Sequence, residues 1–314
     1  MLPALKHLGG TSPDGTVAKR EHPKPPHLPA TEPGRPAFPE PSIILDKPRM
    51  TRMSPEPLPP PFHKVILPAE SISTALIDNS ASSTAIALLS LAQLQLALEE
   101  HQAEAVIIAE LLSPAEVQHF GRFAYPKRRL EWLGGRLAVK SCLALLLKQT
   151  GSTPPSFRNC TILPQPSGRP QLEISQAQLP ALSVSISHSR DYAAALVHNG
   201  SACGIDIQEQ TAQLFTVQER FTSDAEIALL QEIPEPVTRL AAIWVIKEAV
   251  KKCAFADSDL YFGSIQLIAF QGESVKASAV AQYQPVNADP ISIPVQIAQF
   301  KNYLVACTTG ERHA

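Results

Sequence analysis

Two long helical segments dominate the pattern of apolar and polar positions along the chain. One helix is predicted from about Lys127 to Gln149 and another from Val237 to Ala254. Two shorter helices are predicted after capping serines, in Ser113-Pro114-Ala115-Glu116 and in Ser223-Asp224-Ala225-Glu226. The apolar face of the first long helix runs through Leu130, Leu133, Leu137, Ala144 and Leu145.

Alternating segments predict a set of strands. Apolar residues and serines alternate from Leu182 to Ser189, and further strands are predicted from Tyr192 to Val197 and from Ala202 to Ile207. The Asn199-Gly200 pair between the last two favours a hairpin turn. Short strands with turns are predicted from Ser264 to Thr308, whereas residues 65–112 leave helix and strand undecided.

Helix and strand material thus occurs twice, before and after about residue 200. This pattern predicts an α+β fold of two similar halves, residues 63–200 and 201–314. Residues 1–62 differ from the rest, because they hold 16 of the 30 prolines and no Trp or Tyr. Such a segment buries too little apolar surface to offset its ordering entropy. We expect a disordered tail there, with a Pro-rich docking peptide as the alternative.

Composition narrows the class of protein. The net charge of −2 gives no electrostatic case for nucleic acid or membrane as the main partner, so an anionic ligand needs a local basic cluster. The most apolar stretch, from Ala85 to Leu98, is shorter than the ~20 residues of a membrane span. Five widely spaced cysteines and a polar start without a secretory signal favour a soluble, cytoplasmic protein with reduced thiols.

The first candidate for chemistry is the acidic residue in Gly204-Ile205-Asp206-Ile207. The flanking isoleucines favour burial and would hold Asp206 at a defined point of a strand. A rigid, partly desolvated carboxylate there is a good ligand for a hard cation. Taken alone, an aspartate in this setting is more typical of a turn or an ion pair.

A second cluster lies within the helix that follows. Trp244, Glu248 and Lys252 share one stripe at i, i+4 and i+8, and Lys247 and Lys251 form a neighbouring pair. A carboxylate among lysines can bind a metal while the ammonium groups neutralise phosphates. A solvated pair between Glu248 and Lys252 is the simpler explanation of the same pattern.

Basic and polar residues in the first half complete the candidates. Arg128, Trp132, Arg136 and Lys140 form one stripe, which is a candidate phosphate clamp or a solvated charged face. The glycines of Gly134-Gly135 cost about 1 kcal/mol each in a helix, so we expect backbone to approach closely there.

Two further segments could add polar groups to a site. Ser187-His188-Ser189 ends the alternating strand, and His188 alone is more typical of a hydrogen-bonded, half-buried histidine than of a catalyst. The Gly168-Arg169-Pro170 segment is a predicted tight turn that could present another cation.

Together these motifs resemble the 4′-phosphopantetheinyl transferases, in particular the larger class of the surfactin-synthetase-activator type. That family's pattern is Gly-Ile/Val-Asp followed about forty residues later by Trp/Phe-x-x-Lys-Glu-x-x-x-Lys. Asp206 and Glu248 are 42 residues apart, and Lys247 and Lys252 occupy the lysine positions. The match extends from about residue 112 to 262, and about 250 ordered residues fit the fused, pseudo-twofold class, in which each half packs a small, mostly antiparallel sheet on a long helix.

The resemblance implies an activity and its site. The protein would be a monomer that transfers 4′-phosphopantetheine from coenzyme A to a serine of an acyl or peptidyl carrier protein. Asp206 and Glu248 would hold Mg²⁺, with Gln208 and Glu226 as weaker candidates for further ligands. The implied coenzyme A contacts are Lys127 or Arg128, Arg169, Ser187, His188, Lys247 and Lys252, and the implied catalytic residues are Glu248, Lys252, Asp206 and His188.

Departures from the family pattern leave alternatives open. The family often has Glu where this chain has Gln208, and a hydroxyl or thiol residue where it has Val245. Glu226 matches a family glutamate but also occupies the third helical position after the capping Ser223, which favours a capping role. The alternatives are therefore a non-catalytic module that binds coenzyme A or a carrier domain, and an unrelated Mg²⁺-nucleotide enzyme; the latter is disfavoured because no glycine-rich phosphate loop is present.

Overall fold

The computed structural model describes residues 83–100, 104–175, 182–255, 262–273, 276–285 and 288–310. The chain divides into two units, Met1–Arg52 and Met53–Ala314, and all described residues belong to the second unit. The predicted Pro-rich tail, residues 1–62, lies outside the described residues.

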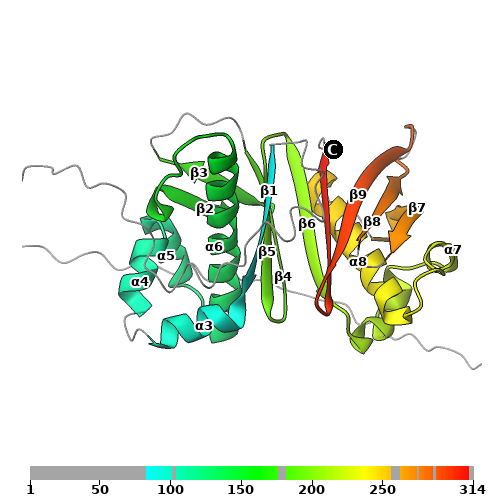
Figure 1. The fold of residues 1–314 in the computed structure, drawn as a ribbon, viewed down its shortest axis with the longest axis horizontal. Helices are drawn as coiled ribbons and strands as arrows, with labels where there is room; N and C mark the ends of the chain where they lie inside the picture. The colour runs from blue at the N-terminus through cyan, green and yellow to red at the C-terminus, as the bar shows by residue number, and fades with distance from the viewer. Residues whose placement is uncertain are drawn as a thin grey trace, which may run out of the picture. The chain divides into compact units, whose positions relative to one another are not determined.

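The first of two larger sheets is antiparallel, with strand order β1-β5-β4. The long helix α6 packs on one of its faces, beside the shorter helices α3, α4 and α5 (Figure 1). A separate two-stranded sheet, β2-β3, lies next to β4. The elements of this part are β1 Thr84–Ser90, α3 Leu91–Glu100, α4 Glu104–Leu111, α5 Pro114–Phe120, α6 Pro126–Gln149, β2 Cys160–Pro164, β3 Pro170–Ile174, β4 Ser183–Ser189 and β5 Tyr192–His198, with a 3₁₀ turn at Phe157–Asn159.

The second sheet is also antiparallel, with strand order β6-β10-β9-β8-β7. Helix α8 packs on the face of this sheet that points away from the first sheet and contacts all five strands, while α7 lies beside β7. The chain is therefore α+β, as predicted. These elements are β6 Ala202–Glu209, α7 Asp224–Leu229, α8 Pro236–Ala254, β7 Ile265–Glu273, β8 Lys276–Tyr283, β9 Ile291–Phe300 and β10 Tyr303–Gly310, with 3₁₀ turns at Ala212–Thr216, Gln218–Arg220 and Phe262–Ser264.

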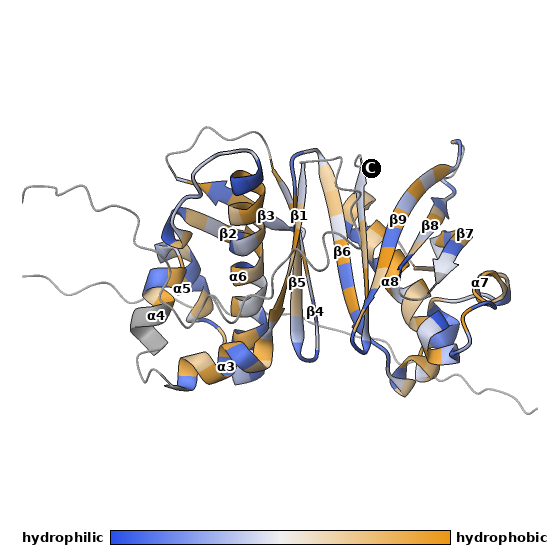
Figure 2. Cartoon of the chain, in the orientation of Figure 1, coloured by the Kyte–Doolittle hydropathy of each residue, from blue (hydrophilic) through white to orange (hydrophobic). Residues whose placement is uncertain are grey.

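The two sheets pack face to face, so that α6 and α8 lie on the outer sides of the central pair (Figure 1). Alternating side chains make this possible, because successive residues of a strand point to opposite faces. On β1, for example, Ile86 and Leu88 face the second sheet, whereas Ala85 and Ala87 face α6. Figure 2 shows the hydrophobic residues along β1 and α3. No helix among the described residues is long and apolar enough to cross a membrane.

The helix boundaries follow the predicted caps. The side chains of Ser113 and Ser223 each accept the backbone N–H of the residue three positions later. The side chains of Glu116 and Glu226 in turn accept the backbone N–H of these serines. Both capping boxes are thereby confirmed. The long helices begin at Pro126 and Pro236, one residue before the predicted starts.

The expected close approach of the Gly134-Gly135 backbone is also confirmed. A Cβ on Gly134 would lie 2.4 Å from Leu91 Cδ2, and one on Gly135 would lie 2.8 Å from Ile186 Cγ2. Helix α6 can therefore rest directly on the first sheet.

The hairpin predicted at Asn199-Gly200 is wrong. Strand β5 pairs with β1 and β4, whereas β6 pairs with β10, so this connection passes from one sheet to the other. A type I′ turn needs positive φ at both central residues, and neither Asn199 nor Gly200 has it. The tight two-residue turns lie instead at Arg190, with φ 47°, and at Lys301, with φ 52°.

Candidate active site

A row of serine hydroxyls joins the two sheets at their edge strands, β4 and β6. The edge of a sheet presents N–H groups without a strand partner, and here serine side chains of β4 accept them. Ser183, Ser185 and Ser187 are buried and Ser189 is half-buried, although their alternation with apolar residues would suggest a solvent-facing side. The N–H groups of Ile205, Ile207 and Glu209 donate to the hydroxyls of Ser185, Ser187 and Ser189 over 3.1, 3.4 and 3.0 Å.

Gly204 brings β6 against α8. A Cβ at this position would lie 1.9 Å from the carbonyl oxygen of Ala249 and 2.8 Å from the backbone nitrogen of Cys253. No other residue type fits this contact without movement of the helix. Asp206 lies two residues further along the same face of the strand, so its side chain also points toward α8.

The carboxylate of Asp206 lies at the centre of the candidate site and is only 4% exposed. The hydroxyl of Ser187 donates to Oδ1 over 2.6 Å, and Lys252 Nζ donates to the same oxygen over 2.7 Å. Lys252 also donates to the carbonyl of Ile205 over 3.2 Å. The second oxygen, Oδ2, is buried and has no hydrogen-bond partner. A buried acceptor without a partner is costly, so Oδ2 is suited to a ligand.

Glu248 faces this group from α8. Burial raises the pKa of Glu248, the Asp206 carboxylate raises it further, and the ammonium groups of Lys252 and Lys251 lower it. The two carboxylates therefore interact electrostatically. Trp244 lies on the same helical stripe, with its ring 5.1 Å from that of Phe221. The predicted i, i+4, i+8 stripe is the partly open face of α8, because the residues between its members are buried, with the exception of Lys251.

A cavity of about 240 Å³ opens beside these residues. It is lined by the β2–β3 turn, strand β4 and helix α8. Arg169, which is only 7% exposed, contributes to its wall from the β2–β3 turn, where Gly168 has φ 86°. The cavity unites three motifs that are far apart in sequence. Its lining residues are Ser167, Gly168, Arg169, Pro170, Val184, Ser185, Ile186, Glu248, Lys251 and Lys252.

His188 links this region to the start of α6. Its Nδ1 lies 3.8 Å from Glu131 Oε1. Burial lowers the pKa of His188, while Glu131 raises it. Lys127 and Arg128 lie 3.8 and 4.0 Å from the same glutamate. Lys127 is 83% exposed and Arg128 is 55% exposed, so both cations remain accessible to an anionic ligand.

Lys247 and Glu226 lie elsewhere and bind each other. Lys247 Nζ is 2.7 Å from Glu226 Oε1, donates to the carbonyl of Phe221 over 2.7 Å and is 2% exposed. Glu226 also accepts the N–H groups of Ser223 and Leu267, over 2.9 Å each, and the hydroxyl of Ser223 over 3.0 Å. This geometry gives both residues a structural role. It does not support the expectation that Lys247 contacts phosphates, nor that Glu226 binds a metal.

The second half of the predicted phosphate clamp along α6, Arg136 and Lys140, lies largely inside the protein. Lys140 is buried against Glu116, and the guanidinium of Arg136 stacks 4.2 Å over the ring of the buried Trp132. Of that stripe only Arg128 is exposed. The simple i, i+4 pattern missed this because it cannot tell an outward face from one covered by α5 and β2.

The donor atoms present fit a hard divalent cation. Asp206 and Glu248 supply carboxylate oxygens, one of them the partnerless Oδ2, and oxygen ligands are those that Mg²⁺ prefers. Gln208 follows on the same face of β6, with its amide nitrogen donating to the carbonyl of Glu209 over 2.9 Å. Among the described residues no three His, Cys, Asp or Glu side chains are placed to hold a metal. At a site of two carboxylates the remaining oxygens would come from water or from a bound molecule.

Sequence reasoning missed Glu131, the ion pair of Glu116 with Lys140, and the serines as a group. Glu131 lies between two cations and His188, and its one signal was the i, i+4 spacing from Lys127. The alternation of Ser183, Ser185, Ser187 and Ser189 was visible, but the alternation does not say that a second sheet covers it.

Comparisons with known proteins place similarity in the second half of the chain. The sequence profile described as "4'-phosphopantetheinyl transferase superfamily" matches residues 202–308. A holo-[acyl-carrier-protein] synthase of Geobacillus sp. (strain WCH70) is 36% identical over 90 residues, which is 29% of this chain and 74% of that protein. The same enzyme of Geobacillus kaustophilus (strain HTA426) is 36% identical over 87 residues, which is 28% of this chain and 66% of that protein.

Two solved structures give weaker likenesses. A holo-(acyl-carrier-protein) synthase from Bacillus anthracis in complex with CoA (3′,5′-ADP) is 23% identical and covers 37% of this chain and 93% of its own, with a TM-score of 0.31. The Helicobacter pylori enzyme in complex with coenzyme A is 22% identical and covers 37% and 97%, also with a TM-score of 0.31.

Proposed function

Because the chain belongs to the 4′-phosphopantetheinyl transferase superfamily, we propose that it transfers 4′-phosphopantetheine from coenzyme A to a serine of an acyl or peptidyl carrier protein. The observation that carries this proposal is the buried carboxylate of Asp206, whose Oδ1 is held by Ser187 and Lys252, whose Oδ2 has no hydrogen-bond partner, and which interacts electrostatically with Glu248. This arrangement suits a reaction in which a pyrophosphate supplies the remaining oxygens.

Asp206 and Glu248 would hold Mg²⁺, with Gln208 as a weaker candidate for a third ligand. When bound, the ion would neutralise charge on the pyrophosphate oxygens and make the phosphorus more electrophilic. Mg²⁺ commonly binds one or two carboxylates together with substrate phosphates, which agrees with two protein carboxylates at this site.

The chain's own residues would divide the remaining tasks. Glu248 accepts the proton of the carrier serine as the serine oxygen bonds to the β-phosphorus of coenzyme A. The bond from that phosphorus to the bridging oxygen breaks, and 3′,5′-ADP leaves with the electron pair. Lys252 stabilises the charge that develops on the phosphoryl oxygens. Arg169 and Lys251, which both line the cavity, bind phosphate groups of coenzyme A.

Cations at the start of α6 would extend the coenzyme A site. Lys127 and Arg128 are exposed and can contact a phosphate, and His188 lies between their partner Glu131 and the Asp206 group. Burial lowers the pKa of His188 and so favours its neutral form, which can donate or accept a hydrogen bond at the nucleotide. Ser187 would act mainly through Asp206, since its hydroxyl is already engaged there.

We also infer that the chain is of the larger, pseudo-twofold class. The support is a repeated structural device. In one half, Glu116 ends a capping box and binds a lysine of the long helix and the N–H of Ile162 in β2. In the other half, Glu226 ends a capping box and binds Lys247 of the long helix and the N–H of Leu267 in β7. Two halves that arose by duplication would retain such a pairing.

The proposal is tested by incubating the protein with coenzyme A, Mg²⁺ and a panel of apo carrier proteins. We expect a carrier to gain the mass of one phosphopantetheine, and EDTA to abolish the gain. Asp206→Asn and Glu248→Gln should each eliminate turnover, whereas Glu219→Gln, at an exposed position, should not. Coenzyme A binding without transfer to any carrier would favour the alternative, a non-catalytic binding module.

A further inference from the structure

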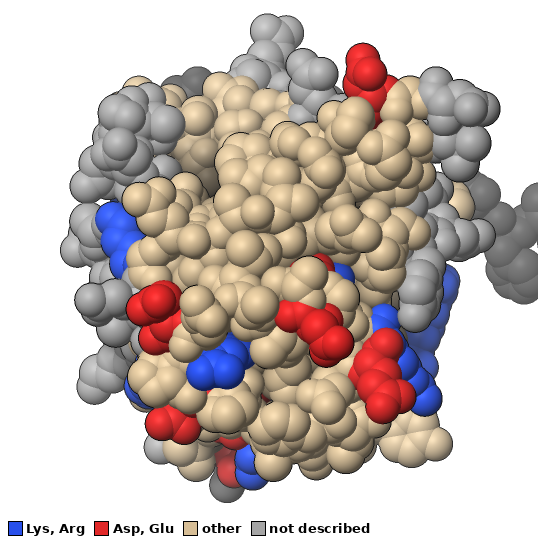
Figure 3. All heavy atoms as spheres, turned by 90° about the vertical axis from the view of Figure 1, so that its right-hand side faces the viewer, with Lys and Arg blue, Asp and Glu red and all other residues tan. Residues whose placement is uncertain are grey.

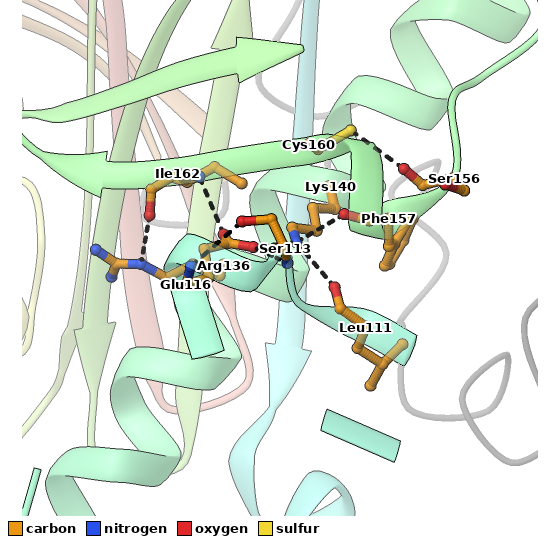
Figure 4. Close-up of polar contacts among 9 residues, drawn as sticks. All are labelled: Leu111, Ser113, Glu116, Arg136, Lys140, Ser156, Phe157, Cys160 and Ile162. Carbon is orange, nitrogen blue, oxygen red and sulfur yellow. Dashed lines mark hydrogen bonds and ion pairs between the residues drawn. The ribbon is translucent and has the colours of Figure 1, made fainter. Parts of the chain in front are cut away.

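A fully satisfied ion pair lies behind β2, in the interior of the first half (Figure 4). Glu116 is 0% exposed, and Lys140 Nζ lies 2.6 Å from its Oε2. The same oxygen accepts the N–H of Ser113 over 2.8 Å, and Oε1 accepts the N–H of Ile162 over 3.0 Å. Both oxygens of this carboxylate therefore have partners.

The lysine of the pair is equally engaged. An ammonium group has three N–H donors, and those of Lys140 reach Glu116 and the carbonyl oxygens of Leu111 and Phe157, over 2.8 and 2.9 Å. Separating a buried pair of this kind is strongly unfavourable, because it would leave an uncompensated charge in the interior. The pair is thus a fixed point to which other elements can be attached.

Ile162 of β2 is the residue attached to it. Its N–H donates to Glu116, and its carbonyl accepts from Arg136 Nε over 3.4 Å (Figure 4). The Arg136 guanidinium is itself fixed by stacking 4.2 Å over Trp132. Strand β2 is an outer strand of a two-stranded sheet, so the two side chains take the place of a missing strand neighbour.

The hairpin held in this way carries a cavity residue. Pro164 of β2 pairs with Pro170 of β3, and the N–H of Gln165 donates to the carbonyl of Arg169 over 2.8 Å. Arg169 lines the same cavity as Glu248, Lys251 and Lys252 of α8. A two-stranded hairpin is only marginally stable alone, so the position of Arg169 depends on what anchors β2.

We propose that Glu116, Lys140 and Arg136 are positioning residues, which fix the β2–β3 hairpin so that Arg169 is held ready for an anionic phosphate group in the cavity. The inference rests on the proposed function for the identity of that ligand as coenzyme A. A pre-fixed guanidinium binds more tightly, because no ordering cost remains at the moment of binding.

The second half supports this interpretation by contrast. Glu226 and Lys247 hold Leu267 of β7 in the same manner, yet β7 contributes no residue to the cavity. The device is therefore a general anchor of the fold, and in the first half alone it anchors a strand that leads to the site.

The test measures the Kd for coenzyme A by calorimetry, together with kcat and KM, in four variants. Glu116→Gln/Lys140→Met and Arg136→Met loosen the anchor, and Arg169→Met removes the cation that it positions. Leu94→Ala, a buried change on α3, is the control for destabilisation alone. Thermal melting first establishes that each variant is folded at the assay temperature.

We expect both anchor variants to raise the Kd and KM for coenzyme A about tenfold, with kcat per folded molecule and the KM for the carrier protein within about twofold of the parent. Leu94→Ala should lower the melting temperature without raising either constant. Combined with Arg169→Met, the anchor changes should add no further increase in Kd, because they act through Arg169.

Multiplicative increases in Kd in the combined variants would overturn the inference, as would equal effects of Leu94→Ala and the anchor changes. These outcomes are distinct from failure of the proposed function. A parent protein that binds coenzyme A but modifies no carrier would refute the transferase activity and leave the Kd comparison decisive for the anchor. A parent protein that binds no coenzyme A would refute both.

Discussion

Gly204→Ala tests whether the close contact of β6 with α8 determines the geometry of the site. The added Cβ would lie 1.9 Å from the carbonyl oxygen of Ala249, where ordinary contact begins at 3.4 Å. Strand and helix would therefore have to separate by about 1.5 Å. Both elements are buried, and the opposing atoms belong to backbone, so a side-chain rotation cannot relieve the contact.

The magnitude follows from this separation. Overpacking of a core costs about 1–3 kcal/mol, and a backbone contact places this change at about 3 kcal/mol of unfolding free energy. For a unit of this size each kcal/mol lowers Tm by about 2–4 °C, so we expect a decrease of about 6–12 °C. Asp206 would shift with β6 relative to Glu248 and Lys252, and a misplacement of about 1 Å can reduce turnover about 100-fold.

Calorimetry of unfolding and the carrier-modification assay measure the two effects. The matched control is Gly310→Ala on the neighbouring strand β10, because no atom lies within 4 Å of the Cβ added there. We expect the control to keep its Tm and its turnover. If Gly204→Ala lost less than about 2 °C and kept its turnover, the close contact would not be what positions Asp206.

Three further changes separate structural from catalytic roles. Ser187→Ala removes the hydrogen bond to the Asp206 carboxylate. It should reduce turnover about 10–100-fold and raise the Mg²⁺ concentration needed for half-maximal rate. The control Ser189→Ala removes a similar hydrogen bond to β6 and should affect only Tm. Lys247→Met leaves Glu226 buried and unpaired and should cost about 3–5 kcal/mol in urea unfolding; adding Glu226→Gln should restore much of this stability, and no recovery would argue against a purely structural pair. Lys127→Ala should leave Tm unchanged, since the side chain is 83% exposed, and should raise the KM for coenzyme A severalfold; an unchanged KM at low salt would exclude it from the coenzyme site.

The local elements were predictable because their signals are local. Capping boxes at Ser113 and Ser223 and the stripe of Trp244, Glu248 and Lys252 depend on residues within three turns of helix, and the structure places them as the sequence indicates. The glycines of α6 could likewise be interpreted, since a helix tolerates such residues at a cost that close packing can offset.

Contacts between different helices and strands were harder to predict from the sequence. Lys140 and Lys247 carry the charge of surface residues, yet both are buried against glutamates 24 and 21 positions earlier. Neither pairing has a signal in a single helix face, because the partner lies on another element. The hairpin prediction at Asn199-Gly200 was wrong for the same reason. The dipeptide favours a tight turn locally, but β6 pairs with β10 of the second sheet and not with β5.

The polar and charged groups of the site come from both halves of the fold, so neither half forms the site alone. The second sheet and α8 bring Asp206, Glu248 and Lys252, while the first sheet brings Ser187, and its adjoining hairpin brings Arg169. On the face at the far end of the second sheet, Figure 3 shows Lys and Arg scattered among Asp and Glu. The hydroxyl ladder between β4 and β6 is the part that joins both contributions, because the same Ser187 oxygen accepts a backbone N–H of β6 and donates to Asp206. One hydroxyl therefore couples the packing of the two sheets to the orientation of the Asp206 carboxylate.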